Sequence, residues 1–323
     1  MMPALADSLR RAADPSAAFC VPLQGDTAVM ACHFNPCGYK RPRRNLQVFL
    51  AFMAGCGAPL FMAELTFGTA PRELPESDRV LHLHLDTPDG IFHKEGMLNA
   101  VERIVPAPFT KLLWVDADVI LTNSDWLADA SAALDAAPVA QLFERAVLTD
   151  DAWQEAAVLA STAHAHRYDP ERAHRFQYHA GLAWGARREM WSEAGGLYAH
   201  SVAGHGDTVF ALAAIDRFHR SHPHAAAMSA EARIHAERYA RRLTEWRRCR
   251  PVAAVAGDAI HLWHGSVERR GYAGKARLLS GYDPLTHVRK ASSGLLEWTP
   301  SAPESLTSAL KSTFPARRED DPT

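Results

Sequence analysis

Short, largely apolar runs alternate with longer amphipathic runs along the first 140 residues, and this alternation is the strongest constraint on the fold. The apolar runs predict strands over residues 27–34, 59–65, 79–85 and 111–121. The amphipathic runs predict helices over residues 45–56, 95–105 and 124–137. Continuous apolar strands are typical of a sheet covered by helices on both faces. The sequence therefore predicts an α/β fold with a mixed, mostly parallel sheet flanked by helices, and a ligand site at the carboxyl ends of its strands.

The remainder of the chain has no Pro- or Ser-rich linker, so we expect a single domain over residues 26–290 with a C-terminal extension. The first 25 residues have weak periodicity, and residues 291–323 have scattered Pro and Ser, which predicts loosely attached tails. Residues 150–178 are polar and predict a surface excursion or a lid. A basic segment over residues 230–250 predicts a helix.

The composition places the chain among ordinary globular proteins. Of its 323 residues 47% are hydrophobic and 22% are charged, and the formal net charge of -2 gives no general attraction to nucleic acid. No apolar run reaches the roughly 18 residues that span a bilayer, and no secretory signal is evident, so we expect a cytoplasmic protein. The five cysteines lack paired Cys-x-x-Cys spacing, which favours reduced thiols over disulfides or structural zinc.

Two carboxylates follow the strongest predicted strand. The apolar run from Lys111 to Val115 leads into Asp116, Ala117 and Asp118. Carboxylate oxygens at a strand end suit Mg²⁺ or Mn²⁺ bound together with phosphates, because hard cations prefer oxygen ligands. The alternative is structural, with Asp118 or Asn123 ending the strand and capping the helix that begins near residue 124.

The surroundings of this motif resemble the GT-A-fold nucleotide-sugar glycosyltransferases, including the family 2 and galactosyltransferase-like members. In that family a segment with Lys and Asn precedes the Asp-x-Asp. A Gly-rich strand, an Arg-Glu pair, a Gly-Gly turn and an acidic residue follow it, and many members add a late His. The chain carries, in the same order between residues 27 and 285, HKEGMLN, VDAD, HAGLAWGARREMWSEAGGLYAHSVAGHGD and HLWHG. The resemblance implies a nucleotide-binding half over about residues 26–145 and an acceptor and metal half over about residues 146–290.

The resemblance also implies a role for individual residues. Asp118 would bind Mn²⁺ or Mg²⁺ directly, and Asp116 would lie nearer the ribose or a metal-bound water. The late ligand would be His264, or else His261. Asp207 would face the acceptor hydroxyl, although the chain has Gly-His-Gly-Asp where galactosyltransferase-type members carry Gly-Glu-Asp.

The remaining predicted residues would bind the nucleotide sugar. They are Lys94, Asn99, Asp116, Gly181 and Trp184, together with Asn35, Tyr39 and Arg44 around the loop that follows the first strand. Trp184 could stack on a sugar ring or could belong to the core, and both interpretations stand at this point.

Elementary chemistry agrees with these roles. When the bond from an anomeric carbon to a nucleoside diphosphate breaks, negative charge develops on the leaving phosphate, and a bound divalent cation stabilises it as a Lewis acid. The acceptor hydroxyl must lose its proton as it attacks, and a carboxylate such as Asp207 can serve as the general base. If the reaction retains configuration, Asp207 would only position the acceptor.

Several other features have two interpretations. His82 and His84 share one face of a predicted strand and could be ligands, but such residues are more often half-buried and hydrogen-bonded. The basic cluster that contains Arg41, Arg43 and Arg44 could reach donor phosphates or a polyanionic acceptor. The arginines of residues 230–250 alternate with glutamates, which favours a solvated helix face.

The sequence thus predicts a metal-dependent glycosyltransferase with a nucleotide-sugar donor, which family habit makes a UDP-sugar. The acceptor is left open between a saccharide, a lipid-linked glycan, a protein and a hydroxymethylated DNA base, and the oligomeric state is also open. A nucleotidyltransferase remains the rival enzyme, weakened because the loop after the first strand has a single Gly. A binding module that has the fold without turnover is the third hypothesis.

Overall fold

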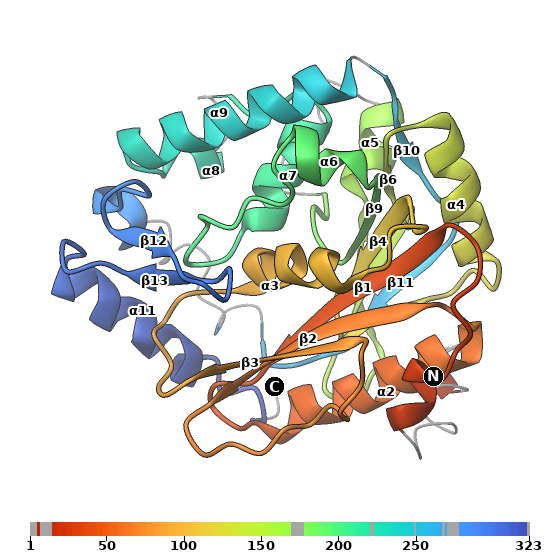
Figure 1. Ribbon diagram of the computed structural model, residues 1–323, viewed down its shortest axis with the longest axis horizontal. Coiled ribbons are helices and arrows are strands. Elements are labelled where there is room, and N and C mark those ends of the chain that lie inside the picture. Colours follow the sequence, from red (N-terminus) through yellow and green to blue (C-terminus); the bar gives the residue numbers. More distant parts are fainter. Residues whose placement is uncertain are drawn as a thin grey trace.

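A seven-stranded mixed sheet forms the centre of the computed structural model, which describes residues 5–6, 15–168, 178–219, 223–248, 250–266, 269 and 278–321 (Figure 1). The strands lie in the order β10 (Val252–Ala254), β6 (Val139–Gln141), β9 (Ala183–Arg187), β4 (Lys111–Val115), β1 (Thr27–Phe34), β2 (Leu60–Phe67) and β3 (Val80–Leu85). Only β9 runs antiparallel to its neighbours β4 and β6 within this sheet. The predicted mixed, mostly parallel sheet flanked by helices is confirmed.

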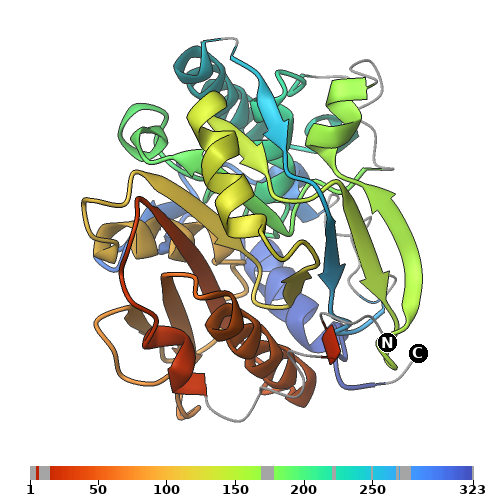
Figure 2. The ribbon, with the colours of Figure 1, turned by 90° about the vertical axis from the view of Figure 1, so that its right-hand side faces the viewer.

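A second sheet lies along one flank of the molecule (Figure 2). Its order is β5 (Val119–Leu121), β11 (Asp258–His261), β7 (Arg145–Thr149) and β8 (Glu155–Ala160). β12 (Val288–Lys290) and β13 (Leu296–Trp298) pair with each other in a separate antiparallel hairpin. The predicted strand over residues 111–121 is therefore two strands, because the chain turns at Asp116 and passes from the first sheet to the second.

Alternate residues of β1 enter two different cores, as the period of two in a strand requires. Val29 and Ala31 pack with α2 (Lys40–Cys56) and α4 (Trp126–Ala136). Ala28 and Met30 belong to the core on the opposite face, with α3 (Lys94–Val101), α7 (Gly206–Ala214) and α9 (Ala230–Arg247). Helices thus cover both faces of the sheet, which explains why its central strands β1 and β4 are mostly apolar and buried.

The shorter helices connect these layers. They are η1 (Pro15–Phe19), η2 (Glu102–Ile104), α5 (Thr162–Tyr168), α6 (Glu189–Glu193), α8 (Pro223–Ala226) and η3 (Leu279–Gly281). The longer helix α2 ends at Gly57, whose φ of 64° lies in the left-handed region that glycine adopts at no steric cost. No helix in the described part of the chain is long and apolar enough to cross a membrane.

The predicted loose C-terminal tail is wrong. Residues 304–316 form α11 (Glu304–Ala316), which lies beside the β12–β13 hairpin (Figure 1). Leu306, Leu310 and Phe314 recur every four residues and are buried, so they form the apolar stripe of an amphipathic helix. The scattered Pro and Ser residues of this region hid that stripe in the sequence.

Two further expectations need correction. In the N-terminal segment, residues 15–19 form η1, which packs on α2 through Phe19, while residues 1–4 and 7–14 lie outside the described part. In the predicted excursion over residues 150–178, β8 pairs with β7 and α5 follows it, because the second sheet supplies a pairing edge that local polarity does not reveal. Residues 169–177 lie outside the described part. Cys20, Cys32 and Cys37 are free thiols, Cys56 accepts a hydrogen bond from Nε1 of Trp126 at 3.4 Å, and Cys249 lies outside the described residues.

Candidate functional site

A cavity of about 780 Å³ opens where β1 and β4 end. Parallel strands that end at one edge of a sheet leave a crevice there, so the position agrees with the expected ligand site. Its walls come from segments far apart in sequence, which include the loop after β1, the turn after β4, the N-termini of α3 and α7, and the chain after β11. The cavity is lined by eight of the predicted residues: Tyr39, Lys94, Asp116, Asp118, Gly181, Asp207, His261 and His264.

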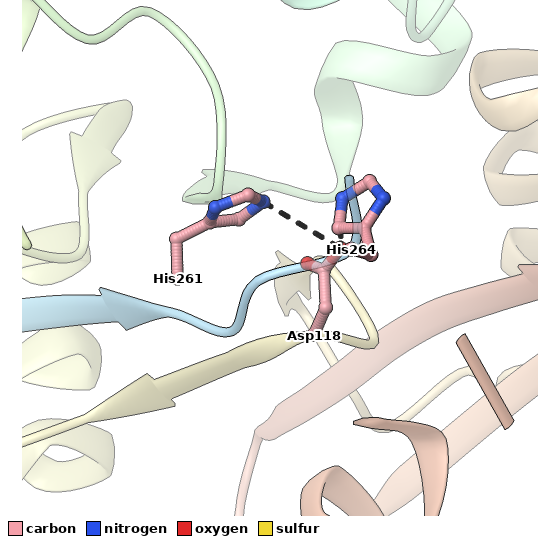
Figure 3. Close-up of side chains that lie close together, drawn as sticks. All are labelled: Asp118, His261 and His264. Atoms are coloured by element: carbon pink, nitrogen blue, oxygen red, sulfur yellow. Dashed lines mark ion pairs between the residues drawn. The ribbon is translucent and has the colours of Figure 1, made fainter. Parts of the chain in front are cut away.

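Asp118, His261 and His264 form a compact cluster at this cavity (Figure 3). Oδ2 of Asp118 lies 3.0 Å from Nε2 of His264 and 3.6 Å from Nε2 of His261. The candidate ligand atoms of the three residues all lie within 4.8 Å of one another. Neighbouring ligand atoms around a hard divalent cation are about 3 Å apart, given metal–ligand distances of about 2.1 Å. The cluster therefore has the spacing of a metal site.

Pairing in the second sheet brings the three residues together. His261 ends β11 and lies opposite Val119 of β5, so Asp118, one residue earlier, lies beside it. The backbone N–H of Leu262 donates to the carbonyl oxygen of Asp118 at 2.8 Å, which fixes the chain that leads to His264. The sequence left His261 and His264 as alternatives, and the structure places both in the cluster.

The charge of Asp118 is set by its surroundings. Burial raises the pKa of its carboxyl group, but the imidazoles of His261 and His264 outweigh burial, so this pKa lies well below its ordinary value. Its Oδ1 atom is buried and has no hydrogen-bond partner among the described residues. An ionised oxygen without a donor is costly in a protein interior, and a bound cation would satisfy it.

A second charged group adjoins the cluster. Nζ of Lys94 lies 2.7 Å from Oδ1 and 2.8 Å from Oδ2 of Asp116, and 3.9 Å from Oδ2 of Asp207. Burial lowers the pKa of Lys94, but the two carboxylates outweigh it and keep the ammonium charged. Burial raises the pKa of Asp116, which Lys94 opposes. Asp116 thus faces Lys94 and stands outside the cluster of three possible metal ligands.

Asp207 lies in the first turn of α7, where a negative charge interacts favourably with the helix dipole. Burial raises its pKa, but Lys94, His205 and His179 outweigh that effect, so the pKa lies below its ordinary value and the carboxylate is ionised. A Cβ atom at Gly181 would lie 2.3 Å from Oδ2 of Asp207. Only glycine at position 181 therefore allows the carboxylate to lie where it does.

Glu95 also lines the cavity, although no sequence motif singled it out. Its side chain is buried, and its Oε2 atom has no hydrogen-bond partner among the described residues. A Cβ atom at Gly206 would lie within 2.7 Å of the carboxyl group of Glu95, so only glycine at position 206 leaves this carboxyl group where it is. Burial raises the pKa of Glu95 to about 8 and keeps it protonated at neutral pH. The available signal was the placement of Glu95 three residues before the apolar Leu98, on the buried face of the helix.

Two predicted nucleotide-sugar residues do not line the cavity. Asn99 accepts hydrogen bonds from the N–H groups of Leu197 and Trp191, at 2.9 and 3.0 Å, and so fixes the Gly-Gly turn. The side chain of Trp184 is buried in the core against Phe210, and its Nε1 donates to a backbone carbonyl. The core interpretation of Trp184 is therefore correct, because its position along β9 directs it to the face covered by α7.

Asn35 and Arg44 also lie outside the cavity wall, contrary to prediction. Asn35 exchanges two hydrogen bonds with the backbone of Tyr39, at 2.7 and 2.9 Å, and so closes the loop after β1. The guanidinium of Arg44 lies 4.5 Å from the ring centroid of Trp153. Arg41 similarly lies 4.9 Å from the ring of Trp263. Both arginines belong to the start of α2 and connect it by cation–π contacts to the segments that carry Trp153 and Trp263.

The remaining basic and His-containing features have structural roles. His82 contacts the buried carboxylate of Glu64 at 3.0 Å, and His84 is half exposed, so neither belongs to the cluster of possible metal ligands. The predicted basic helix is α9. The exposed arginines of this helix are Arg238, Arg241 and Arg242, whereas Arg247 in its last turn is buried.

No family model and no curated sequence matches the chain. The catalytic domain of Drosophila β1,4-galactosyltransferase 7, in complex with xylobiose, is similar over 59% of this chain and 61% of that chain, with 13% identity and a TM-score of 0.36. The chain thus covers less than two thirds of that relative.

Two further solved structures cover more of the chain. Glucosyl-3-phosphoglycerate synthase from Mycobacterium tuberculosis, in complex with Mn²⁺, UDP-glucose and phosphoglyceric acid, covers 88% of this chain and 89% of its own, with 10% identity and a TM-score of 0.40. Mannose-1-phosphate geranyltransferase from Thermus thermophilus covers 73% and 75%, with 12% identity and a TM-score of 0.33. These likenesses concern the fold alone.

Proposed function

We propose that this protein is a metal-dependent, GT-A-like glycosyltransferase that moves a sugar from a nucleoside diphosphate to an acceptor hydroxyl. The observation that carries the proposal is the cluster of Asp118, His261 and His264 at the wall of a cavity of about 780 Å³. A cavity of this size accommodates a nucleotide sugar. UDP is proposed as the nucleotide because it is the habitual donor nucleotide of the family that the motifs resemble.

The donor set fits a divalent cation. Asp118 supplies an ionised carboxylate, and the Oδ1 atom of this group has no hydrogen-bond partner among the described residues. His261 and His264 supply one imidazole nitrogen each. Nitrogen ligands favour Mn²⁺ over Mg²⁺, although the three side chains alone would also accept Fe²⁺ or Zn²⁺. When bound, the cation would stabilise the charge of the leaving diphosphate as a Lewis acid.

Three other groups of the chain complete the proposed chemistry. Lys94 places a buried positive charge beside Asp116, within reach of a donor in the cavity. Asp207 is ionised and lies at a helix N-terminus on the cavity wall, where its Oδ2 atom could accept the proton of an acceptor hydroxyl. The acceptor hydroxyl would belong to a saccharide or to a hydroxymethylated DNA base.

The proposal is tested by thermal-shift titration with UDP, GDP and CDP, each with and without Mn²⁺. We expect one nucleotide, UDP, to raise the melting temperature only when Mn²⁺ is present, because binding to the native state stabilises it. A response to no nucleotide would support a binding module with another ligand. Incubation with UDP-sugars then separates the rival enzyme, since a glycosyltransferase releases UDP whereas a nucleotidyltransferase transfers the nucleotidyl group.

Replacement of either imidazole should weaken metal binding. We expect His264→Ala and His261→Ala each to raise the Mn²⁺ concentration for half-maximal stabilisation by UDP at least about 10-fold. Loss of a residue that only hydrogen-bonds to a metal ligand lowers metal affinity by about 10-fold or more, and loss of the ligand itself should lower it at least as much. His84→Ala, on the exposed part of β3, is the matched control. An unchanged Mn²⁺ requirement in one variant would remove that histidine from the ligand set.

Asp207→Asn should separate chemistry from donor binding. We expect turnover to fall about 10²- to 10⁴-fold, because the amide cannot accept the proton, while the Kd for UDP with Mn²⁺ stays within about threefold. Single-turnover kinetics and the nucleotide titration measure the two quantities separately. An equal loss in both would indicate that Asp207 only shapes the turn at Gly181.

A further inference from the structure

The segment after α11 reaches the proposed metal site. Oε1 of Glu319 lies 3.1 Å from Nδ1 of His264, and Nε2 of the same ring faces Asp118 at 3.0 Å. Glu319 is 7% exposed and lines the cavity. The imidazole of His264 therefore lies between two carboxylates, with Asp118 beside Nε2 and Glu319 beside Nδ1.

Independent contacts fix the position of Glu319. The carboxylate of the next residue, Asp320, accepts the backbone N–H groups of Lys40 and Arg41 at 2.9 and 2.8 Å, at the start of α2. This arrangement satisfies amides that the helix itself leaves unpaired and places a negative charge at the positive end of the helix dipole. The C-terminal segment is therefore attached to the main domain immediately beside Glu319.

A second attachment lies on the other side of Glu319. The guanidinium of Arg317 donates to Oε1 of Glu319 at 3.3 Å and lies over the rings of Phe92 and Phe314, 5.5 and 5.2 Å from their centroids. The hydroxyl of Tyr39 donates to the carbonyl of Pro315 at 3.0 Å. Glu319 is thus held from both sides by residues of the cavity wall and by α11.

The contact has a definite chemical consequence for His264. A neutral imidazole has one N–H and one lone pair. When Nδ1–H donates to the carboxylate of Glu319, the lone pair is on Nε2, on the side of Asp118. A carboxylate in this position also raises the basicity of the ligating nitrogen and fixes the orientation of the ring.

We infer that Glu319 is a positioning residue of the metal site, which fixes the tautomer and the orientation of His264 so that Nε2 binds the cation. The C-terminal segment is on this basis a part of the functional centre. The inference rests on the proposed function, since it requires that Asp118, His261 and His264 bind a metal.

The test measures Mn²⁺ affinity directly, by the decrease of the electron paramagnetic resonance signal of free Mn²⁺ on titration with the full-length protein. We expect Glu319→Ala to weaken Mn²⁺ binding about 10- to 100-fold, the usual effect of losing an outer partner of a metal-binding histidine. Glu319→Gln should recover most of the affinity, because its amide oxygen still accepts from Nδ1–H. Asp321→Ala is the matched control, since Asp321 lies two residues away and contacts Arg269 at 3.3 Å.

A double-mutant cycle shows whether Glu319 acts through His264. We expect the double variant with His264→Ala and Glu319→Ala to bind Mn²⁺ as weakly as His264→Ala alone. Additive losses would overturn the inference, as would an unchanged affinity in Glu319→Ala. If the wild-type protein binds no Mn²⁺, the proposed function is contradicted. If the wild type and Glu319→Ala bind Mn²⁺ equally well, the proposed function stands and only the role of Glu319 is contradicted.

Discussion

The Asp118→Asn variant is expected to lose Mn²⁺-dependent turnover by a factor of about 10³ or more while it keeps its fold. Asp118 supplies the negative charge among the three clustered side chains, since His261 and His264 are neutral when they bind a metal. An amide of the same shape cannot neutralise the cation. Removal of a single hydrogen-bond donor that stabilises developing negative charge lowers the rate about 10²- to 10³-fold. Loss of the bound cation should lower the rate further, because the cation stabilises the charge on the leaving diphosphate.

Turnover is measured as UDP release from the donor sugar that the titration identifies, across a range of Mn²⁺ concentrations. Circular dichroism and the melting temperature without metal show whether the variant folds. Asp125→Asn, at an exposed carboxylate before α4, is the control for the chemical change. A fully active Asp118→Asn protein would remove the metal assignment and with it the proposed mechanism.

The Glu95→Gln variant is expected to become more stable than the wild type as the pH rises. Burial raises the pKa of Glu95 to about 8 in the folded protein, whereas the ordinary value is 4.5. Below pH 4.5 both states are protonated and the group has no pH-dependent effect. Between pH 4.5 and 8 the unfolded chain releases a proton that the folded chain retains, so the free energy of unfolding of the wild type falls.

The expected size follows from the shift. Each pKa unit corresponds to about 1.4 kcal/mol, so the wild type should lose about 3 to 5 kcal/mol relative to Glu95→Gln by pH 8. Urea unfolding of both proteins at a series of pH values measures this difference. Glu193→Gln, at an exposed position of α6, controls for the change from carboxyl to amide. A difference that stays constant from pH 4.5 to 8 would show that Glu95 ionises in the folded protein as it does in the unfolded chain.

The sequence by itself was sufficient for the fold class and for four of the seven strands of the first sheet, β1, β2, β3 and β4. The run over 27–34 coincides with β1, which is buried along most of its length. The run over 79–85 coincides to within a residue with the edge strand β3, in which apolar residues alternate with histidines. The same reasoning placed Asp118 at the cavity, since a carboxylate after a buried parallel strand lies at the edge where ligands bind.

Motif order alone was less reliable for individual side chains. Lys94 and Asn99 come from the same motif, yet Lys94 lines the cavity and Asn99 fixes a turn elsewhere. The two residues are five positions apart on a helix with 3.6 residues per turn, so their side chains point in different directions. Membership of the same motif therefore does not show which face of the helix a residue occupies. Trp184 shows the same effect on a strand, where direction alternates with every residue.

The tertiary structure decided the composition of the site. Asp118 and His261 meet because β5 pairs with β11, and Glu319 reaches His264 because Asp320 attaches the chain end to α2. These contacts join residues separated by more than 50 positions, whereas periodicity reports only on neighbours within a few residues. Local periodicity therefore predicted most of the elements in the first 140 residues and the chemical groups they carry, but it missed α11 and β8. Only the packing of those elements, which depends on long-range burial and pairing, determined which groups act together.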